Sequence, residues 1–283
     1  MVNNKIVKFQ KVHVSRILMN IFVFLSSLSC IFPIIWLFYS SLKTQGEFDI
    51  NNFALPKSPT FQNYLHVLTT SDMPRYMLNS IFVTSLSLLF ILFFAFVVGY
   101  FISRFKFKGR NILFSLFMLG MLVPVHSLMV PLYVIFSRLN LVNHYYTLVI
   151  PYFAFQLPVG IYLAESYIHS IPKEMEEASC IDGASFSLTL FKIILPMCKP
   201  ILTTIIIISF FYCWNEFSFA LILTTGVNMR TVPLGLALFS GSFTTNYPIL
   251  MAAMIISTLP TLILYSLFSN KIMDGMVSGA IKG

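Results

Sequence analysis

Six long apolar segments dominate the sequence and restrict what the chain can fold into. They cover about residues 17–42, 78–102, 112–136, 147–169, 201–225 and 249–268. A helix of about 20 apolar residues crosses the hydrocarbon core of a bilayer. Only 10% of the residues are charged, whereas a soluble domain carries roughly a quarter. We therefore predict an all-α integral membrane protein with six transmembrane helices.

Proline interrupts several of the apolar segments. The third contains the stretch VPVHSLMVP, residues 123–131. Membrane helices tolerate proline where neighbouring groups satisfy the carbonyl that it leaves free. We expect this third segment to be bent.

The net charge of +8 follows from a membrane topology. The basic residues lie in short segments between apolar runs and form no single face, so they do not indicate a nucleic-acid partner. With the N-terminus inside, most of the 18 Lys and Arg residues fall on the cytoplasmic side, in the ranges 5–16, 104–110, 173–199 and 271–282. The positive-inside rule then predicts that both termini are cytoplasmic.

Several motifs are absent from the sequence. The four cysteines show no CxxC spacing, so we expect neither a disulfide framework nor a metal site. There is no phosphate loop of the form G-x-x-x-x-G-K-[ST], and no triad or carboxylate pair in a soluble domain. We predict no enzyme activity and no cofactor. The first apolar segment lacks a small-x-small cleavage pattern and is expected to be a retained anchor.

Two loops are expected outside the membrane. The segment 43–77 is rich in turn-forming residues, and a short helix is predicted near 61–68. The segment 226–248 is of mixed polarity, and its middle is expected to form an interfacial or re-entrant helix.

The segment 173–196 begins with charged residues and turns apolar toward Leu195 and Pro196, and the segments on both sides are apolar. Pro172 suits the first turn of a helix, where its missing N–H costs nothing. Gly183 can end this helix in a left-handed conformation, and Ser185 can cap a second helix. Pro196 is expected to stop that second helix. The product is a pair of short helices with a sharp corner.

This corner resembles the EAA loop of ABC-importer permeases. The family pattern is Glu-Ala-Ala, three residues, Gly, nine residues, then Ile-x-Leu-Pro. The chain matches it with Glu177, Ala178, Ser179, Asp182, Gly183, Ile193, Leu195 and Pro196. Ser179 stands where the family has its second alanine. Serine is nearly as small, so close helix packing should survive.

The resemblance extends along most of the chain. The stretches LNSIFVTSLSLL and WNEFSFALILTT, and the ending MDGMVSGAIKG, are similar to maltose-permease-like subunits of the carbohydrate-uptake family. The resemblance implies the transmembrane domain of a type I ABC importer. It implies four regions: a cytoplasmic tail 1–16, a first transmembrane helix and extracytoplasmic segment 17–72, the transmembrane type-1 domain 73–270 with its EAA coupling loop 173–196, and a cytoplasmic tail 271–283.

The function implied by this resemblance is uptake of a sugar or oligosaccharide by alternating access, in a bacterial cell membrane. The implied partners are a second, different permease subunit, two copies of a cytoplasmic ATP-binding subunit, an extracytoplasmic sugar-binding protein and membrane lipid. The EAA loop docks on the ATPase in this family. Glu177 and Asp182 would then be polar contacts to the ATPase, and Gly183 would allow close backbone approach.

Polar residues inside the apolar segments are candidates for the translocation path, because ionisable groups in a bilayer are costly. Trp214, Asn215 and Glu216 lie in the fifth segment and His126 in the third. Each also has a structural interpretation. Glu216 can fix the packing of a neighbouring helix, and His126 can bond a carbonyl freed by proline.

Two other functions remain open from the sequence. The chain can be an ion-coupled secondary transporter in which Glu216 or Glu165 carries a proton. It can also be an ABC-importer permease for a solute other than sugar. The EAA-like loop favours an ABC importer over an ion-coupled carrier, and the C-terminal tail favours a sugar, by resemblance.

Overall fold

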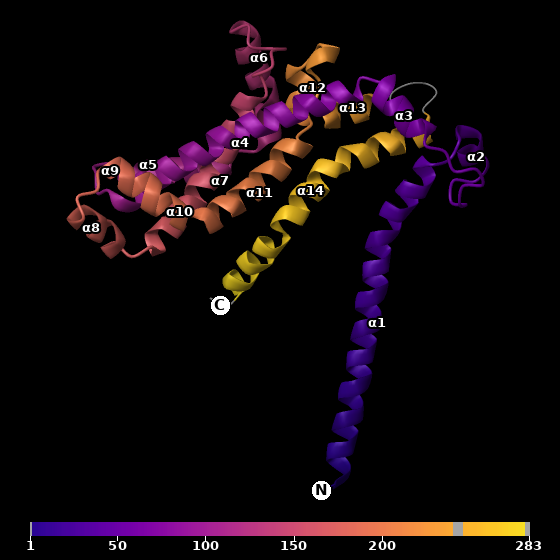
Figure 1. The fold of residues 1–283 in the computed structure, drawn as a ribbon, viewed down its shortest axis with the longest axis horizontal. Helices are drawn as coiled ribbons and strands as arrows, with labels where there is room; N and C mark the ends of the chain where they lie inside the picture. The colour runs from indigo at the N-terminus through magenta and orange to yellow at the C-terminus, as the bar shows by residue number, and fades with distance from the viewer. Residues whose placement is uncertain (1, 240–245, 281–283) are drawn as a thin grey trace. The chain divides into compact units, whose positions relative to one another are not determined.

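The structure is a computed structural model that describes residues 2–239 and 246–280. Within these ranges all regular elements are helices, which confirms the predicted all-α class (Figure 1). In chain order they are α1 (Val2–Ser41), α2 (Gln45–Ile50), α3 (Gln62–Thr69), α4 (Met73–Arg104), α5 (Arg110–Met121), η1 (Val125–Leu128), α6 (Met129–Arg138), α7 (Val149–Ser170), α8 (Glu174–Ile181), α9 (Phe186–Leu188), η2 (Thr189–Ile194), α10 (Leu195–Met197), α11 (Lys199–Asn215), α12 (Ser218–Leu223), η3 (Val227–Met229), α13 (Val232–Phe239) and α14 (Tyr247–Ala280).

Three of the described helices are long and apolar enough to cross a membrane by themselves: Arg16–Ser41, Met73–Arg104 and Tyr247–Phe268. Two bent helix pairs also qualify, so the number rises to 5 if each pair is one span. The remaining predicted segment, 147–169, corresponds to α7. All six predicted segments are thus largely helical, but the count of six spans is not reproduced by length and hydropathy.

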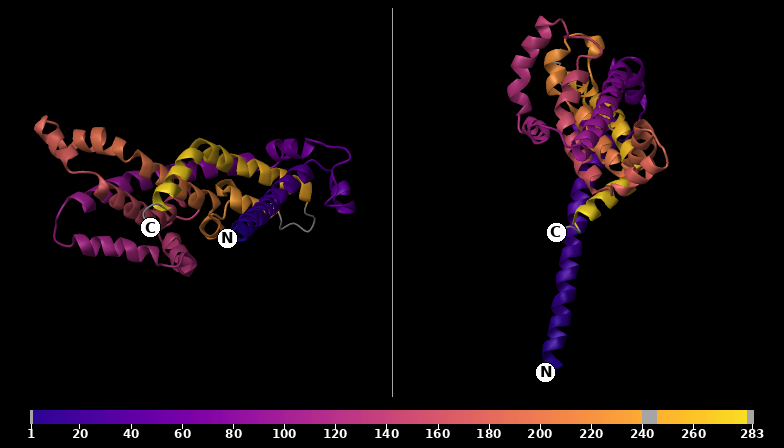
Figure 2. Two further views of the ribbon diagram at one scale, coloured as in Figure 1. Left: turned by 90° about the horizontal axis from the view of Figure 1, so that it is seen from below. Right: turned by 90° about the vertical axis from the view of Figure 1, so that its left-hand side faces the viewer.

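The third apolar segment is bent, as its prolines predict. Arg110–Met121 and Val125–Arg138 meet at an angle of 92°. Figure 2 shows the chain turning sharply between α5 and α6. The break lies at Pro124, which has no N–H to continue the helical hydrogen-bond pattern.

The chain divides into two compact units, Met1–Ser71 with Ser240–Ile256 and Asp72–Phe239 with Ser257–Gly283. In the first unit the end of α1 is covered by its own following loop. The Lys43 Nζ donates to the carbonyls of Asn51 and Asn52 at 3.2 and 2.9 Å. The Asn63 amide donates to the carbonyl of Ser41 at 2.7 Å. These bonds satisfy Lys43, which is only 1% exposed.

Burial lowers the pKa of the Lys43 amine, and the nearby Glu47 carboxylate opposes this shift. The predicted short helix near 61–68 is confirmed as α3, and Asn63 in that helix joins it to the end of α1. The segment after α1, which was expected to form a loop outside the membrane, therefore contains two short helices, α2 and α3.

The core of the second unit is the crossing of α4 and α7, against which α11 also packs. Small residues meet there. A Cβ atom added to Gly99 would lie 2.8 Å from the Cβ of Ala164, and one added to Gly160 would lie 2.8 Å from the Cβ of Ala95. In each helix the two small residues are four apart, so they share one face. Small residues let membrane helices approach closely, since lipid provides no hydrophobic force between them.

Candidate functional site

The corner predicted at 173–196 is present at one end of the second unit, where α8 and α9 lie beyond the ends of α4 and α7 (Figure 1). Gly183 has φ +75°, and the N–H of Ala184 donates to the carbonyl of Ser179 at 3.0 Å. This is the predicted left-handed helix end. The Ser185 Oγ accepts from the N–H of Leu188 at 3.4 Å, which confirms the predicted cap of the second helix.

Two details of the prediction for this corner are wrong. Pro172 is not in the first turn of α8, because the helix begins at Glu174 with Lys173 at the capping position. Pro196 does not stop the second helix, because α10 runs from Leu195 to Met197. The preceding turn is π-helical over Thr189–Ile194. This local departure from the α-helical bonding pattern accommodates a residue that has no N–H.

The chain instead bends after α10. The helical stretch Phe186–Met197 and the following Lys199–Asn215 meet at 70°. Pro200 lies at the start of α11, where a missing N–H costs nothing. The apolar second helix therefore continues through Pro196 to Met197, and α11 begins directly after the bend.

A buried hydroxyl pair joins the two helices of the corner. The Oγ of Ser179 and the Oγ1 of Thr189 lie 2.7 Å apart, and both residues are buried. Close packing is retained at Ser179, as expected for so small a side chain. The hydroxyl that replaces the alanine of the family pattern adds a hydrogen bond between α8 and η2.

An ion pair anchors α8 to the end of α4. The Nε of Arg104 lies 2.6 Å from the Oε1 of Glu176, with side-chain exposures of 5% and 20%. The hydroxyl of Tyr100 donates to the Oε2 of Glu176 at 2.9 Å. A second nitrogen of Arg104, Nη2, donates to the carbonyl of Ile171 at 2.8 Å. The chain before and inside α8 is thus held by one turn of α4.

Aromatic side chains surround this anchor. The rings of Phe101 and Phe105 stack with centroids 5.1 Å apart. Phe186, the first residue of α9, lies 6.0 to 6.2 Å from the rings of Tyr100, Phe101 and Phe105. Aromatic pairs of this kind contribute about 0.5–1.5 kcal/mol beyond their buried area. Both helices of the corner are therefore fixed to α4.

The opposite side of the corner is open. Glu177, Ala178, Asp182 and Gly183 are exposed, and Ile181 is 87% exposed. Of the other motif residues, Ile193 and Leu195 are half-buried and Pro196 is exposed. Ile181 is therefore a large apolar side chain on the open side of a helix that carries three glutamates.

Sequence reasoning missed Tyr100, Arg104, Glu176 and Ile181. Arg104 counted only as one of the charges expected on the cytoplasmic side. A large apolar residue between Cys180 and Asp182, in a helix where Met175 is the other one, was the available signal for Ile181.

Glu216 occupies the break between α11 and α12. Its carboxylate accepts hydrogen bonds from the Tyr152 hydroxyl at 2.9 Å and from the N–H groups of Phe219 and Ala220 at 2.8 and 3.3 Å. The two N–H groups belong to the first turn of α12, where a helix leaves donors unpaired. The contacts of Glu216 therefore join α7, α11 and α12.

The other polar candidates lie in different surroundings. Trp214 is buried and stacks on Phe210 with ring centroids 5.6 Å apart. Asn215 is exposed, and its amide donates back to the carbonyl of Phe211 at 2.9 Å. His126 is exposed in η1, and its side chain forms no hydrogen bond with any residue that the structure describes. The structure does not bring His126 together with the residues around Glu216.

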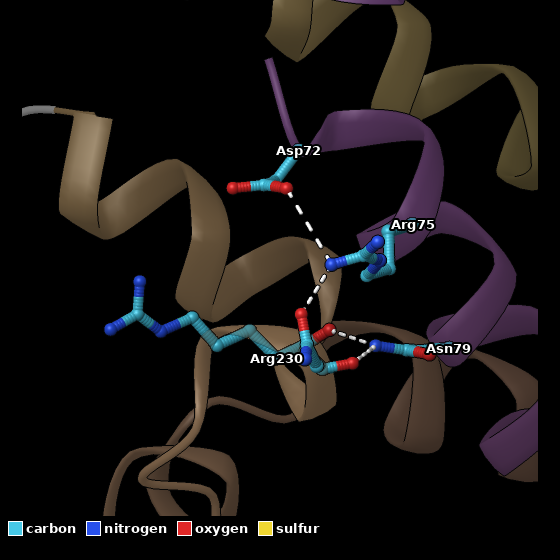
Figure 3. A network of polar contacts seen from close by, with 5 residues as sticks. Asp72, Arg75, Asn79 and Arg230 are labelled. Atoms are coloured by element: carbon cyan, nitrogen blue, oxygen red, sulfur yellow. Dashed lines mark hydrogen bonds and ion pairs between the residues drawn. The ribbon is translucent and has the colours of Figure 1, made fainter.

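A polar network that the sequence did not suggest holds the other end of α4 (Figure 3). The Asn79 amide donates to the carbonyls of Asn228 and Arg230 at 2.8 and 2.9 Å. Arg75 donates to the side chain of Asn228 and lies 3.9 Å from Asp72. The short helix η3 and the chain leading into α13 are thereby attached to the start of α4.

Residues 91–274 match the family described as "Binding-protein-dependent transport system inner membrane component". The chain belongs to this family. The matched part begins inside α4 and includes the corner, the bend at Cys198 and the break at Glu216.

Relatives of this transport component match along nearly the whole chain. The chain is 37% identical to a putative ABC transporter permease protein of Caldicellulosiruptor sp., over 89% of its own length and 91% of the relative. It is 38% identical to the trehalose/maltose transport system permease protein of Thermococcus litoralis, over 95% and 97%. The fold matches a bacterial ABC transporter involved in alginate import with a TM-score of 0.80, at 22% identity and over 91% of this chain and 96% of that one. The predicted family and fold class are thus confirmed.

Proposed function

We propose that this inner membrane component is the permease subunit of an ATP-driven importer for a sugar or oligosaccharide. The names of its relatives support the substrate class, because they include trehalose/maltose, sulfoquinovosyl glycerol and arabinooligosaccharide transport permeases. The observation that carries the coupling role is the corner of α8 and α9, which is fixed to α4 on one side and open on the other. Family membership favours this function over an ion-coupled carrier.

The proposed partner on the open side is a cytoplasmic ATPase subunit. Ile181 supplies an apolar anchor, and Glu177 and Asp182 supply charges around it. Exposed apolar residues within a polar rim are the usual composition of a protein interface. The full assembly in this proposal contains two ATPase copies, a second and different permease, and an extracytoplasmic sugar-binding protein.

The proposed mechanism is alternating access driven by rigid-body motion. When the ATPase moves α8, the ion pair between Arg104 and Glu176 and the bond from Tyr100 transmit that motion to α4. Short rigid elements transmit such displacements, whereas a flexible loop would absorb them. Coupling therefore depends on the docking residues and on the anchor residues together.

Docking is tested by placing a charge on the exposed isoleucine. We expect Ile181→Asp to weaken co-purification of the ATPase subunit at least about tenfold, because loss of a central apolar anchor costs about 2 kcal/mol or more. Sugar-stimulated ATP hydrolysis should fall with it. The matched control is Leu55→Asp, at a residue 72% exposed in the other unit, which should leave both unchanged. Normal co-purification and uptake in Ile181→Asp would contradict the docking role.

We also propose that both termini and the α8 corner face the cytoplasm, on the basis of the basic-residue distribution. A cysteine in place of Lys57 should react with a membrane-impermeant maleimide from outside the cell, whereas one in place of Lys108 should react only after permeabilisation. Both lysines are exposed, so access depends on the side of the membrane. Reversed labelling would overturn the orientation. We also propose the four regions that the resemblance implies for the chain, which are 1–16, 17–72, 73–270 and 271–283.

The translocation path remains a prediction. The contacts of Glu216 support its role in packing α7, α11 and α12, since three donors already occupy its carboxylate. Of the polar candidates, Asn215 and His126 are the exposed ones, and they are the residues we propose to face the path.

A further inference from the structure

A basic cavity lies beside the coupling corner, within the second unit. It has a volume of about 490 Å³ and is lined by Ser103, Arg104, Lys106, Arg110, His169, Ser170, Ile171, Pro172, Lys173 and Glu174. Four of these residues carry a positive charge and one carries a negative charge. The positive-inside rule accounts for basic residues at this end of the helices. It does not explain why four of them line one cavity.

Some of the lining charges are already paired. Arg104 is committed to Glu176 and to the carbonyl of Ile171, and Arg110 lies 3.6 Å from Glu165. Within the described residues, Lys106, Lys173 and His169 have no ion pair or side-chain hydrogen bond. Three donors therefore face the cavity without a protein acceptor.

A buried hydroxyl also lies in the wall of the cavity. Ser103 is 7% exposed, its Oγ has no hydrogen-bond partner in the described part of the chain, and it lines this cavity. Buried polar groups are almost always hydrogen-bonded, because leaving one unpaired is costly. An acceptor group inside the cavity would satisfy Ser103 together with the lysines.

The surface next to the cavity is of mixed polarity and includes two exposed apolar side chains. A second depression, of about 380 Å³, shares Lys106 and Arg110 with the first and is also lined by Phe107 and Ile112. Phe107 and Ile112 are exposed. The basic cavity therefore lies beside exposed apolar side chains at the end of membrane helices. This arrangement matches a molecule with an anionic head and an acyl chain.

We propose that this cavity binds the phosphate of an anionic phospholipid, with Lys106, Lys173, His169 and Ser103 as donors and with an acyl chain along Phe107 and Ile112. The shared chemistry is a phosphate group, which a free anion could also present. The adjoining apolar side chains favour the lipid. Because Arg104, Ile171 and Lys173 belong both to the cavity and to the attachment of α8, an occupant would act on the coupling corner directly.

The experiment measures lipid binding to the purified full-length chain in detergent and needs neither sugar nor ATPase, so it is independent of the proposed transport function. Short-chain phosphatidylglycerol, phosphatidylcholine and inorganic phosphate are titrated separately, with bound lipid counted by native mass spectrometry and the Tm followed in parallel. We expect phosphatidylglycerol alone to bind and to raise the Tm. Its affinity should fall about fivefold in Lys106→Gln, from the loss of one basic residue at an anionic headgroup.

The matched control is Lys108→Gln, because Lys108 is exposed in the same loop and lines neither depression. The affinity of Lys108→Gln for phosphatidylglycerol should equal that of the wild type. Ser103→Ala should weaken phosphatidylglycerol binding without changing the Tm of the lipid-free chain by more than a few degrees. Equal losses in Lys106→Gln and Lys108→Gln would indicate general charge attraction and overturn the site. Inorganic phosphate could instead raise the Tm at the same concentrations, with the increase lost in Lys106→Gln. That result would assign the cavity to a soluble anion and overturn the proposal of a lipid.

Discussion

Arg104→Gln is expected to reduce ATP-driven sugar uptake at least about tenfold while the chain still inserts into the membrane. The substitution removes one partner of a largely buried ion pair and leaves the Glu176 carboxylate with only Tyr100. Breaking such a pair costs about 3–5 kcal/mol, because an uncompensated charge stays buried. That cost exceeds what any single aromatic contact of Phe186 contributes, so we expect α8 to lose its fixed position against α4.

The measurement is uptake and ATP hydrolysis in proteoliposomes that contain the complete transporter. Hydrolysis should persist but lose its stimulation by sugar, which separates loss of coupling from loss of the ATPase. The double variant Arg104→Gln/Glu176→Gln removes both charges and should recover part of the uptake. The control is Arg138→Gln, at an exposed arginine with no ion pair among the described residues. Full coupling in Arg104→Gln would show that this ion pair does not carry the motion.

Gly160→Leu is expected to abolish accumulation of folded protein. Even a single methyl group at this position would lie 2.8 Å from the Cβ of Ala95, which is closer than two carbons can approach. The helices α4 and α7 would have to separate, and with them the core against which α11 packs. Overpacking in a tight core costs about 1–3 kcal/mol per modest enlargement and more for a larger one.

The measurement is the yield of monodisperse protein in detergent and its Tm. The control is Gly46→Leu, because a Cβ at Gly46 has no atom within 4 Å. A reciprocal pair sharpens the test: Gly160→Ala should lower the Tm, and adding Ala95→Gly should restore most of it, since the two Cβ atoms compete for one space. An unchanged Tm in Gly160→Ala would mean that the helices are not in close contact there.

The parts of the coupling corner that follow from local chemistry were predictable. A glycine at a helix end and a serine at a helix start act on groups within a few residues of themselves, so Gly183 and Ser185 could be interpreted from their neighbours alone. The same local reasoning failed at Pro196. A π-helical turn over Thr189–Ile194 accommodates that proline, and nothing in the adjacent letters indicates such a turn.

Contacts between distant residues were not predictable in this way. Arg104 and Glu176 are separated in the chain by α5, η1, α6 and α7, and their pairing depends on how α4 and α7 cross. The crossing itself is set by Ala95, Gly99, Gly160 and Ala164, whose spacing is visible in the sequence but whose partners are not. Glu216 is an intermediate case. Its polarity marked it as unusual, whereas its three donors come from α7 and α12 and only the fold reveals them.

The length and attachments of α4 give it the geometry of a lever. It contains 32 residues and its one proline, Pro74, lies in the first turn, so at about 1.5 Å per residue it is a stiff rod about 48 Å long. One end holds the corner of α8 and α9 through Arg104, and the other holds η3 and the chain entering α13 through Asn79. A tilt of about 5° about either end would move the opposite end by about 4 Å, from the same helix length. A small rotation imposed at one end of α4 would therefore displace the other end by about the distance between consecutive Cα atoms.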